Sequence, residues 1–264
     1  MRTKLFTLVA VISAFCLIFV ACSDNPADNN LTEGDPQDPN FQMAQSVTEG
    51  VVDSLFRFAQ TTSNYIDFNG SEPMQAQDSL AIVFDYETCW WYIYLSADTT
   101  DGSMVFVDSL RFEDSEGCQQ YPDSQTTTTI EYRAFIDIDI TSDSGTVAAT
   151  ATENLYLAGI QEDTCVFDVS AASNLELASS LYELSYDYSG NFTHIKFLTE
   201  ELMNDDNPRP VSGSLFLDLT IYGSYQQSSG SWNWNVTVTF NETGYHARAE
   251  SGENYWEWDV TYVT

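Results

Sequence analysis

Positive charge is scarce in this sequence of 264 residues, which has 8 lysine and arginine residues against 40 aspartate and glutamate residues. Nucleic acids and anionic membrane surfaces are bound through clusters of lysine and arginine that neutralise their phosphates. The composition therefore predicts that the chain does not bind nucleic acid. A surface this acidic can concentrate cations, but it is also typical of a well-solvated protein in a salty medium, which is the interpretation we favour.

Catalytic motifs are also missing. His194 and His246 are the only histidines, and neither belongs to a metalloprotease or nucleophile motif. Asp137 and Asp139 share one face of an expected strand, roughly as two carboxylates flank a glycosidic bond, but a chain with 40 acids produces such pairs by chance. We predict no catalytic activity, no cofactor and no metal site. A secreted carboxylate-dependent polysaccharide hydrolase is the enzymatic alternative.

Only one long apolar run is present, Leu5 to Val20, and it follows the basic residues Arg2 and Lys4. It is shorter than the ~20 apolar residues of a membrane-spanning helix. The run ends in Phe19-Val20-Ala21-Cys22, a small residue followed by a cysteine. This arrangement resembles the signal peptide and lipobox of a bacterial lipoprotein.

The resemblance covers only the first two dozen residues. It implies that residues 1–21 are a signal peptide that is removed, and that the Cys22 thiol carries a diacylglycerol anchor. The implied location is the cell envelope, with the chain held to the outer membrane by its lipid and either periplasmic or exposed at the surface. Ser23, rather than Asp, suits the outer membrane. An ordinary secretory signal cleaved after Ala21 is the alternative, and it also exports the chain.

A short polar segment and a helix are expected next. Residues 22–40 contain three prolines and five acids and predict an extended tether. From Asn40, a suitable N-cap, apolar residues recur at spacings of three and four and predict a helix that packs on a sheet. These residues are Ala44, Val47, Val51, Leu55 and Phe58.

From about residue 79 the apolar period changes to two. The clearest strand is Ile130 to Thr141, followed by the turn 142–145 and a return over 146–157. Roughly ten or eleven strands with short connections predict antiparallel pairing. We therefore predict one all-β domain over 41–264, a large antiparallel meander forming a barrel, half-barrel or sandwich with one N-terminal helix. Residues 199–210 are the one long interruption and the candidate for a sub-domain boundary.

Three cysteines remain after Cys22, so at most one internal bridge can form. A hairpin centred on the turn at 142–145 brings Cys118 and Cys165 to the same end of the sheet, which predicts a Cys118–Cys165 disulfide. Cys89–Cys118 is the rival pairing, because Cys89 begins an expected strand at that end. Three free cysteines are the remaining alternative.

Aromatic side chains provide the best indication of a binding surface. Residues 89–95 are apolar on both faces of an expected strand, so Trp90, Tyr92 and Tyr94 form an outward-facing ladder unless a loop or the helix covers it. We predict a non-catalytic binding or structural module of the cell envelope, whose ligand, a protein, a glycan or a lipid, the sequence leaves open. A carrier of an apolar ligand in a half-barrel is the alternative among binding proteins.

Overall fold

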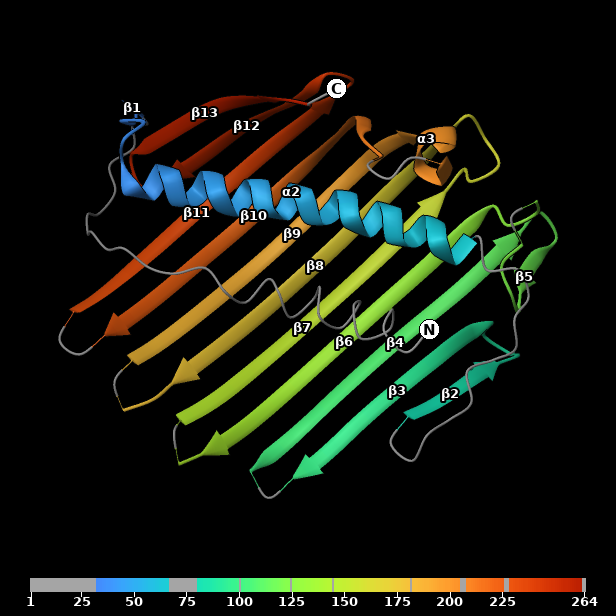
Figure 1. Ribbon diagram of the computed structural model, residues 1–264, viewed down its shortest axis with the longest axis horizontal. Coiled ribbons are helices and arrows are strands. Elements are labelled where there is room, and N and C mark those ends of the chain that lie inside the picture. The colour runs from blue at the N-terminus through green and yellow to red at the C-terminus, as the bar shows by residue number, and fades with distance from the viewer. Residues whose placement is uncertain are drawn as a thin grey trace.

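One continuous β-sheet dominates the computed structural model, and a long helix lies across one of its faces (Figure 1). The structure describes residues 32–66, 80–99, 101–123, 125–143, 145–180, 182–204, 208–225 and 228–262. Its helices are α2 (Pro39–Ile66) and α3 (Thr199–Asn204). Its strands are β1 (Thr32–Glu33), β2 (Leu80–Asp85), β3 (Trp90–Thr99), β4 (Gly102–Asp114), β5 (Gly117–Gln119), β6 (Thr129–Ser142), β7 (Gly145–Ala158), β8 (Thr164–Ala178), β9 (Tyr182–Leu198), β10 (Pro210–Tyr225), β11 (Ser228–Asn241), β12 (Gly244–Ser251) and β13 (Asn254–Thr261).

The strands follow one another across the sheet almost in chain order. The order is β1-β13-β12-β11-β10-β9-β8-β7-β6-β4-β3-β2, and β5 pairs with β4 off this path. All pairs are antiparallel except β1 with β13, which is parallel. The predicted all-β meander with an N-terminal helix is confirmed. Because β1 and β2 lie at opposite edges of the described sheet, the half-barrel and sandwich forms of the prediction fit this order and a closed barrel does not.

The alternating pattern of the sequence gives the sheet two different faces. In β6, Ile130, Tyr132 and Ala134 are buried, whereas Arg133 and Phe135 between and beyond them are exposed. The expected hairpin is confirmed, because Ser142 pairs with Gly145 and the register runs on to Thr129 and Ala158. We call the face that carries α2 the inner face and the opposite one the outer face.

Helix α2 begins two residues before the expected position. The Asp38 carboxylate accepts the N–H of Asn40 at 2.9 Å, so Asp38 and not Asn40 caps the helix, and Pro39 takes the first helical position that proline favours. Four of the five stripe residues are buried in the main core cluster: Ala44, Val47, Val51 and Leu55. The side chain of Phe58 lies outside the described residues. No helix among the described residues is both long and apolar enough to cross a membrane.

Part of the expected tether belongs to the fold. Thr32 and Glu33 form β1 on the edge strand β13, and the Trp256 indole N–H donates to the Asp35 carbonyl at 3.2 Å. Phe41 at the start of α2 stacks on the same indole, with ring centroids 6.0 Å apart. The sheet therefore takes up the chain from residue 32, within the range expected for the tether. Residues 1–31, with Cys22 and the signal peptide, lie outside the described residues.

The interruption at 199–210 does not divide the sheet. Helix α3 forms its first six residues, with Leu202 buried in the core, and β9 and β10 on either side pair with each other along most of their length. One sheet thus runs through the expected boundary.

The predicted Cys118–Cys165 disulfide is wrong, and the rival pairing is present. Cys89 and Cys118 are bonded, with their Cα atoms 5.9 Å apart, and Cys165 is free and buried. Strand β5 folds back on the end of β4, pairing Cys118 with Glu113 beside the start of β3. Strand β8, which carries Cys165, lies at least three inter-strand spacings from β4, about 14 Å, beyond the ~7 Å that a bridge can span.

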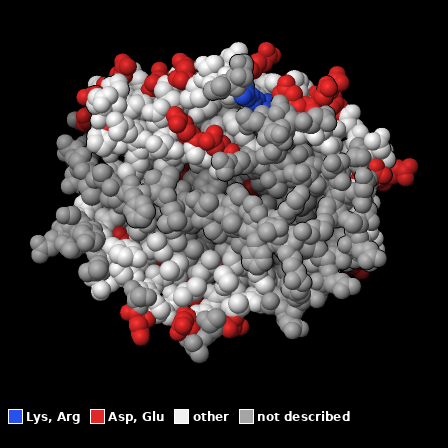
Figure 2. Space-filling model, viewed as in Figure 1, with Lys and Arg blue, Asp and Glu red and all other residues white. Residues whose placement is uncertain are grey.

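Acidic side chains outnumber basic ones on the face that carries α2. Figure 2 shows aspartate and glutamate at several places around the rim of this face, and lysine or arginine in one small area near its upper edge. Four of the basic side chains that the structure describes take part in ion pairs or cation–π contacts: Arg111, Arg133, Arg209 and Arg248.

Candidate functional site: a polar groove on the outer face

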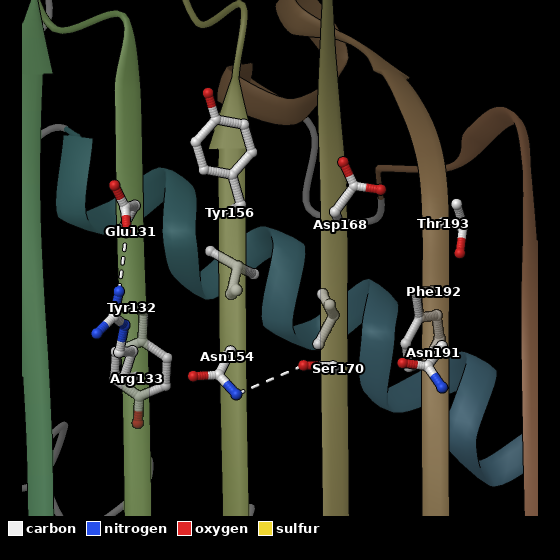
Figure 3. Close-up of a pocket in the computed structure, with 12 residues that line it drawn as sticks. Glu131, Tyr132, Arg133, Asn154, Tyr156, Asp168, Ser170, Asn191, Phe192 and Thr193 are labelled. Carbon is white, nitrogen blue, oxygen red and sulfur yellow. Dashed lines mark hydrogen bonds and ion pairs between the residues drawn. The ribbon is translucent and has the colours of Figure 1, made fainter.

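A groove of about 420 Å³ crosses strands β6 to β9 on the outer face. Figure 3 shows it from the side opposite α2, which lies behind the strands. Two neighbouring rows of outward-facing side chains line it: Arg133, Asn154, Ser170 and Asn191 in one row, and Glu131, Tyr156, Asp168 and Thr193 in the other. Since β6 and β9 are three inter-strand spacings apart, the groove is about 14 Å long.

The floor of the groove consists of short polar side chains. Asn154, Ser170 and Asn191 are direct cross-strand neighbours and are exposed. The Asn154 amide donates to the Ser170 hydroxyl at 3.5 Å, a long bond that a ligand can replace. The residues that alternate with them, Leu155, Val169 and Phe192, are buried in the core. The floor therefore presents polar groups to solvent, and the buried residues of the same strands hold it in position.

A β-bulge shapes one wall. The pairing of β8 with β9 shifts between Phe167 and Val169, so that Thr193 and His194 both lie opposite Asp168. His194 has a positive φ of 51°, and its N–H donates to the Asp168 carboxylate at 2.7 Å. A bulge bends its strand and redirects side chains. Here it places Asp168 and Thr193 at the edge of the groove (Figure 3).

A chain of ion pairs stiffens the opposite wall. Glu131 lies between two guanidinium groups, 3.4 Å from Arg111 and 3.6 Å from Arg133, and Arg111 also pairs with Glu113. The Arg133 guanidinium lies 4.3 Å from the centre of the Trp90 ring, a cation–π contact. Each exposed pair contributes little stability, but the network holds Arg133 in one position.

Because of this contact, one residue of the predicted aromatic ladder, Trp90, is not exposed. Trp90 points to the outer face as expected but is only 6% exposed, because Arg133 covers its ring. Tyr92 and Tyr94 are exposed on that face. They lie outside the groove, with β4 between them and β6.

Two other aromatic rings adjoin the groove. Tyr156 lines it and is 44% exposed. Phe216, also 44% exposed, is the cross-strand neighbour of Asn191 on β10 and continues the floor row beyond the groove. The amide floor is thus flanked by exposed rings on two sides.

None of three comparisons gives a match: no family model, no curated protein and no solved structure is similar to this chain. The site therefore has to be interpreted from its own geometry.

Sequence reasoning missed the groove. Asn154, Ser170 and Asn191 lie on three strands and become neighbours only through the register, and Asp168 shares no motif with them. The alternation of polar and apolar residues predicts that Asn154 and Ser170 point outward, but it does not predict that they are neighbours. Asp137, the acid that the sequence suggested with Asp139, is exposed on β6 and lies outside the groove. In the described part of the chain, no three histidine, cysteine or acidic residues are placed to hold a metal ion.

Proposed function

We propose that this protein is a lipid-anchored, non-catalytic binding module of the cell envelope that binds a neutral glycan in the outer groove. The observation that supports this most directly is the row of Asn154, Ser170 and Asn191 beside the exposed rings of Tyr156 and Phe216. Ligand sites combine a few convergent polar groups with apolar surface in this way.

Hydrogen bonding favours a polyhydroxylated ligand. An asparagine side chain offers two donors and one acceptor oxygen, and a serine hydroxyl offers both roles. Sugar hydroxyl groups likewise donate and accept, so three adjacent groups on the floor can bond successive hydroxyls. A tyrosine or phenylalanine ring provides a rigid apolar surface for the C–H face of a sugar ring.

The charges in the groove favour a neutral glycan over an anionic one. Glu131 and Asp168 contribute carboxylates, and Arg133, the one basic residue among the described residues that line the groove, is already paired with Glu131 and the Trp90 ring. Among these lining residues an anionic polysaccharide would meet two like charges and no unpaired cation. We therefore expect neutral oligosaccharides to bind more tightly than uronic acid polymers.

Replacing both Asn154 and Asn191 by alanine is expected to weaken glycan binding by about tenfold or more, because each lost hydrogen bond contributes roughly 0.5–1.5 kcal/mol. Tyr156→Ala is expected to have a similar effect through the lost ring contact. The measurement is a screen of the wild-type protein on an array of neutral and acidic glycans, followed by calorimetric titration of the best ligand.

Asn235→Ala and Phe135→Ala are the matched controls, since both residues are exposed on the outer face and lie outside the groove. Equal affinity in the groove variants and the controls would refute the site. Failure of the wild-type protein to bind any neutral glycan would refute the proposed ligand class.

A carboxylate-dependent hydrolase is the second candidate, because the groove holds two acids at a relevant spacing. Glu131 and Asp168 both neighbour Tyr156, on its two sides, so their Cα atoms are about two inter-strand spacings, about 10 Å, apart. Both carboxylates already have partners within the protein: Glu131 forms ion pairs with two arginines, and Asp168 accepts the N–H of His194. Recovery of the bound glycan intact after prolonged incubation supports the binding module, whereas new reducing ends would support the hydrolase.

The proposed anchor has its own test. Nine residues lie between Cys22 and Thr32 in β1, so a fully extended tether would hold the sheet up to ~35 Å from the lipid. We expect cells fed a labelled fatty acid to label the wild-type protein, and Cys22→Ser to abolish the label and release the protein from membranes. Cys165→Ser is the control. Equal labelling of wild type and Cys22→Ser would contradict the lipoprotein assignment.

A further inference from the structure

A second set of polar residues lies on the inner face, opposite the outer groove. The register places Asp108, Ala134, Glu153, Ala171 and Gly190 in one row across β4, β6, β7, β8 and β9. Three of the five residues are small, and the two acids lie among them. We call this row the inner trough.

A buried tyrosine points into the trough. Tyr188, two residues before Gly190 on the inner face, is only 8% exposed. Its ring lies over Gly190, since a Cβ at that position would collide with the Tyr188 hydroxyl. No other described residue forms a hydrogen bond with this hydroxyl. The unused hydroxyl is therefore available to a ligand.

The acids of the trough are partly buried without a counter-charge. Glu153 has no hydrogen bond or ion pair in the described structure, and Asp108 accepts only the Tyr132 hydroxyl, at 3.1 Å. Burial, with a smaller effect of the nearby Asp108 charge, raises the pKa of Glu153 to about 7. Burial also raises the pKa of Asp108, against the opposing effect of the Tyr132 hydrogen bond.

The basic side chains that the structure describes lie elsewhere. Arg111, Arg133, Lys196 and Arg248 take outward positions in their strands, and Arg209 packs on Tyr262 before β10. A carboxylate withdrawn from water is normally paired with a cation. The trough thus has negative charge, an unused hydroxyl and aromatic rings, and it lacks a cation among the described residues.

We propose that the inner trough binds a protonated organic amine with an apolar body, with Glu153 and Asp108 facing the ammonium group and Tyr188 beside it. The parallel rings of Tyr186 and Tyr188, 6.3 Å apart, offer faces that attract an ammonium group. The residues next to the row on the inner face, Ile136 and Leu155, are apolar, which is the surrounding that the body of such a ligand needs. A divalent metal ion at this row would take most of its six or more oxygen ligands from water, and no group of three histidine, cysteine or acidic residues among the described residues is placed to hold one.

Binding of an amine should depend on pH. The titratable groups that face Glu153 from the described strands are Asp108 and Tyr132 on one side and Tyr186 and Tyr188 on the other. Because a cation favours the ionised form of Glu153, affinity is expected to rise as pH increases through about 7. Tyr188 remains neutral over this range, since burial raises the pKa of its hydroxyl above the usual value.

The test uses the chain as processed by the cells that export it, titrated with benzylammonium chloride and with its neutral counterpart benzyl alcohol. At about pH 8 we expect the ammonium to bind about tenfold more tightly than the alcohol, and at about pH 5.5 we expect the difference to disappear. Glu153→Gln, which keeps the shape of the side chain, should abolish the preference at both pH values. Asp137→Asn, on the outer face, should leave it unchanged.

Three results would overturn the proposal: equal binding of the alcohol and the ammonium at pH 8, an unchanged preference in Glu153→Gln, or displacement of the ammonium by calcium at equal concentration. If Glu153→Gln does not fold, the pH dependence of the wild-type preference decides the question. The outer groove lies on the opposite face, so loss of glycan binding in its variants is independent of this result.

Discussion

Replacing Trp234 by alanine is expected to lower the free energy of unfolding by about 3–5 kcal/mol, the range for a large aromatic residue in a core. Trp234 is 0% exposed on β11 and lies beside Leu219 of β10 in the main core cluster. Its indole N–H has no hydrogen-bond partner among the described residues, so the variant loses packing and leaves a cavity without breaking a hydrogen bond. Chemical denaturation followed by circular dichroism measures the change.

Thr237→Ala is the matched control for this variant. Thr237 lies on the same strand, but its side chain points to the exposed outer face, where substitutions change stability by about 0.5 kcal/mol or less. Trp234→Phe should lie between the two, since it retains an apolar ring. A loss below about 1 kcal/mol for Trp234→Ala would show that the inner face is not packed as described.

Removing the Cys89–Cys118 disulfide is expected to lower the free energy of unfolding by about 3–4 kcal/mol, because the bond closes a loop of about 30 residues and restricts the unfolded chain. The variant is the double change Cys89→Ala and Cys118→Ala, and reduction of the wild-type protein should have the same effect. The bond also joins β5 to the start of β3, so we expect the edge formed by β2 and β3 to lose its protection from hydrogen exchange first.

Peptide mapping without reduction provides the check on this assignment. We expect one linked pair of peptides that contains Cys89 and Cys118, and a free thiol at Cys165 that reacts only after unfolding, because that residue is buried. A reducing agent should not change the stability of the double variant. A linked peptide that contains Cys118 and Cys165 would contradict the structure and restore the pairing that the sequence suggested.

The parts of the fold that the sequence predicted well are those that depend on local patterns. The 142–145 turn lies between two alternating segments, so its hairpin needs no other information. The apolar stripe of α2 repeats at helical spacing and is buried as expected, although Asp38 competes successfully with Asn40 for the cap. Sheet closure depends on which edges meet, and alternation does not encode that.

The disulfide and the two candidate sites depend on non-local geometry. The return of β5 on β4 occupies three residues, too few to show a period, yet it decides the partner of Cys118. The outer groove needs the register of four strands and a bulge at Asp168. The acids of the inner trough did leave a local signal, since Asp108 and Glu153 occupy apolar phases beside Leu110 and Leu155. An acid in an apolar phase of a strand therefore points to a polar site on the packed face of the sheet.

The parallel pairing of β1 with β13 has a mechanical consequence for a tethered protein. A pull on the tether first loads the hydrogen bonds from the N–H groups of Thr32 and Gly34 to the carbonyl groups of Glu253 and Tyr255. Strand β1 spans two residues, so its pairing with β13 is short and we expect it to open before the longer strand pairs of the sheet. Its release would free residues 32–34, about 10 Å of slack, before the force reaches the hydrogen bond from the Trp256 indole to the Asp35 carbonyl. In the proposed lipid-anchored protein, opening of β1 would therefore lengthen the tether under shear before the strands that carry the outer groove bear the load.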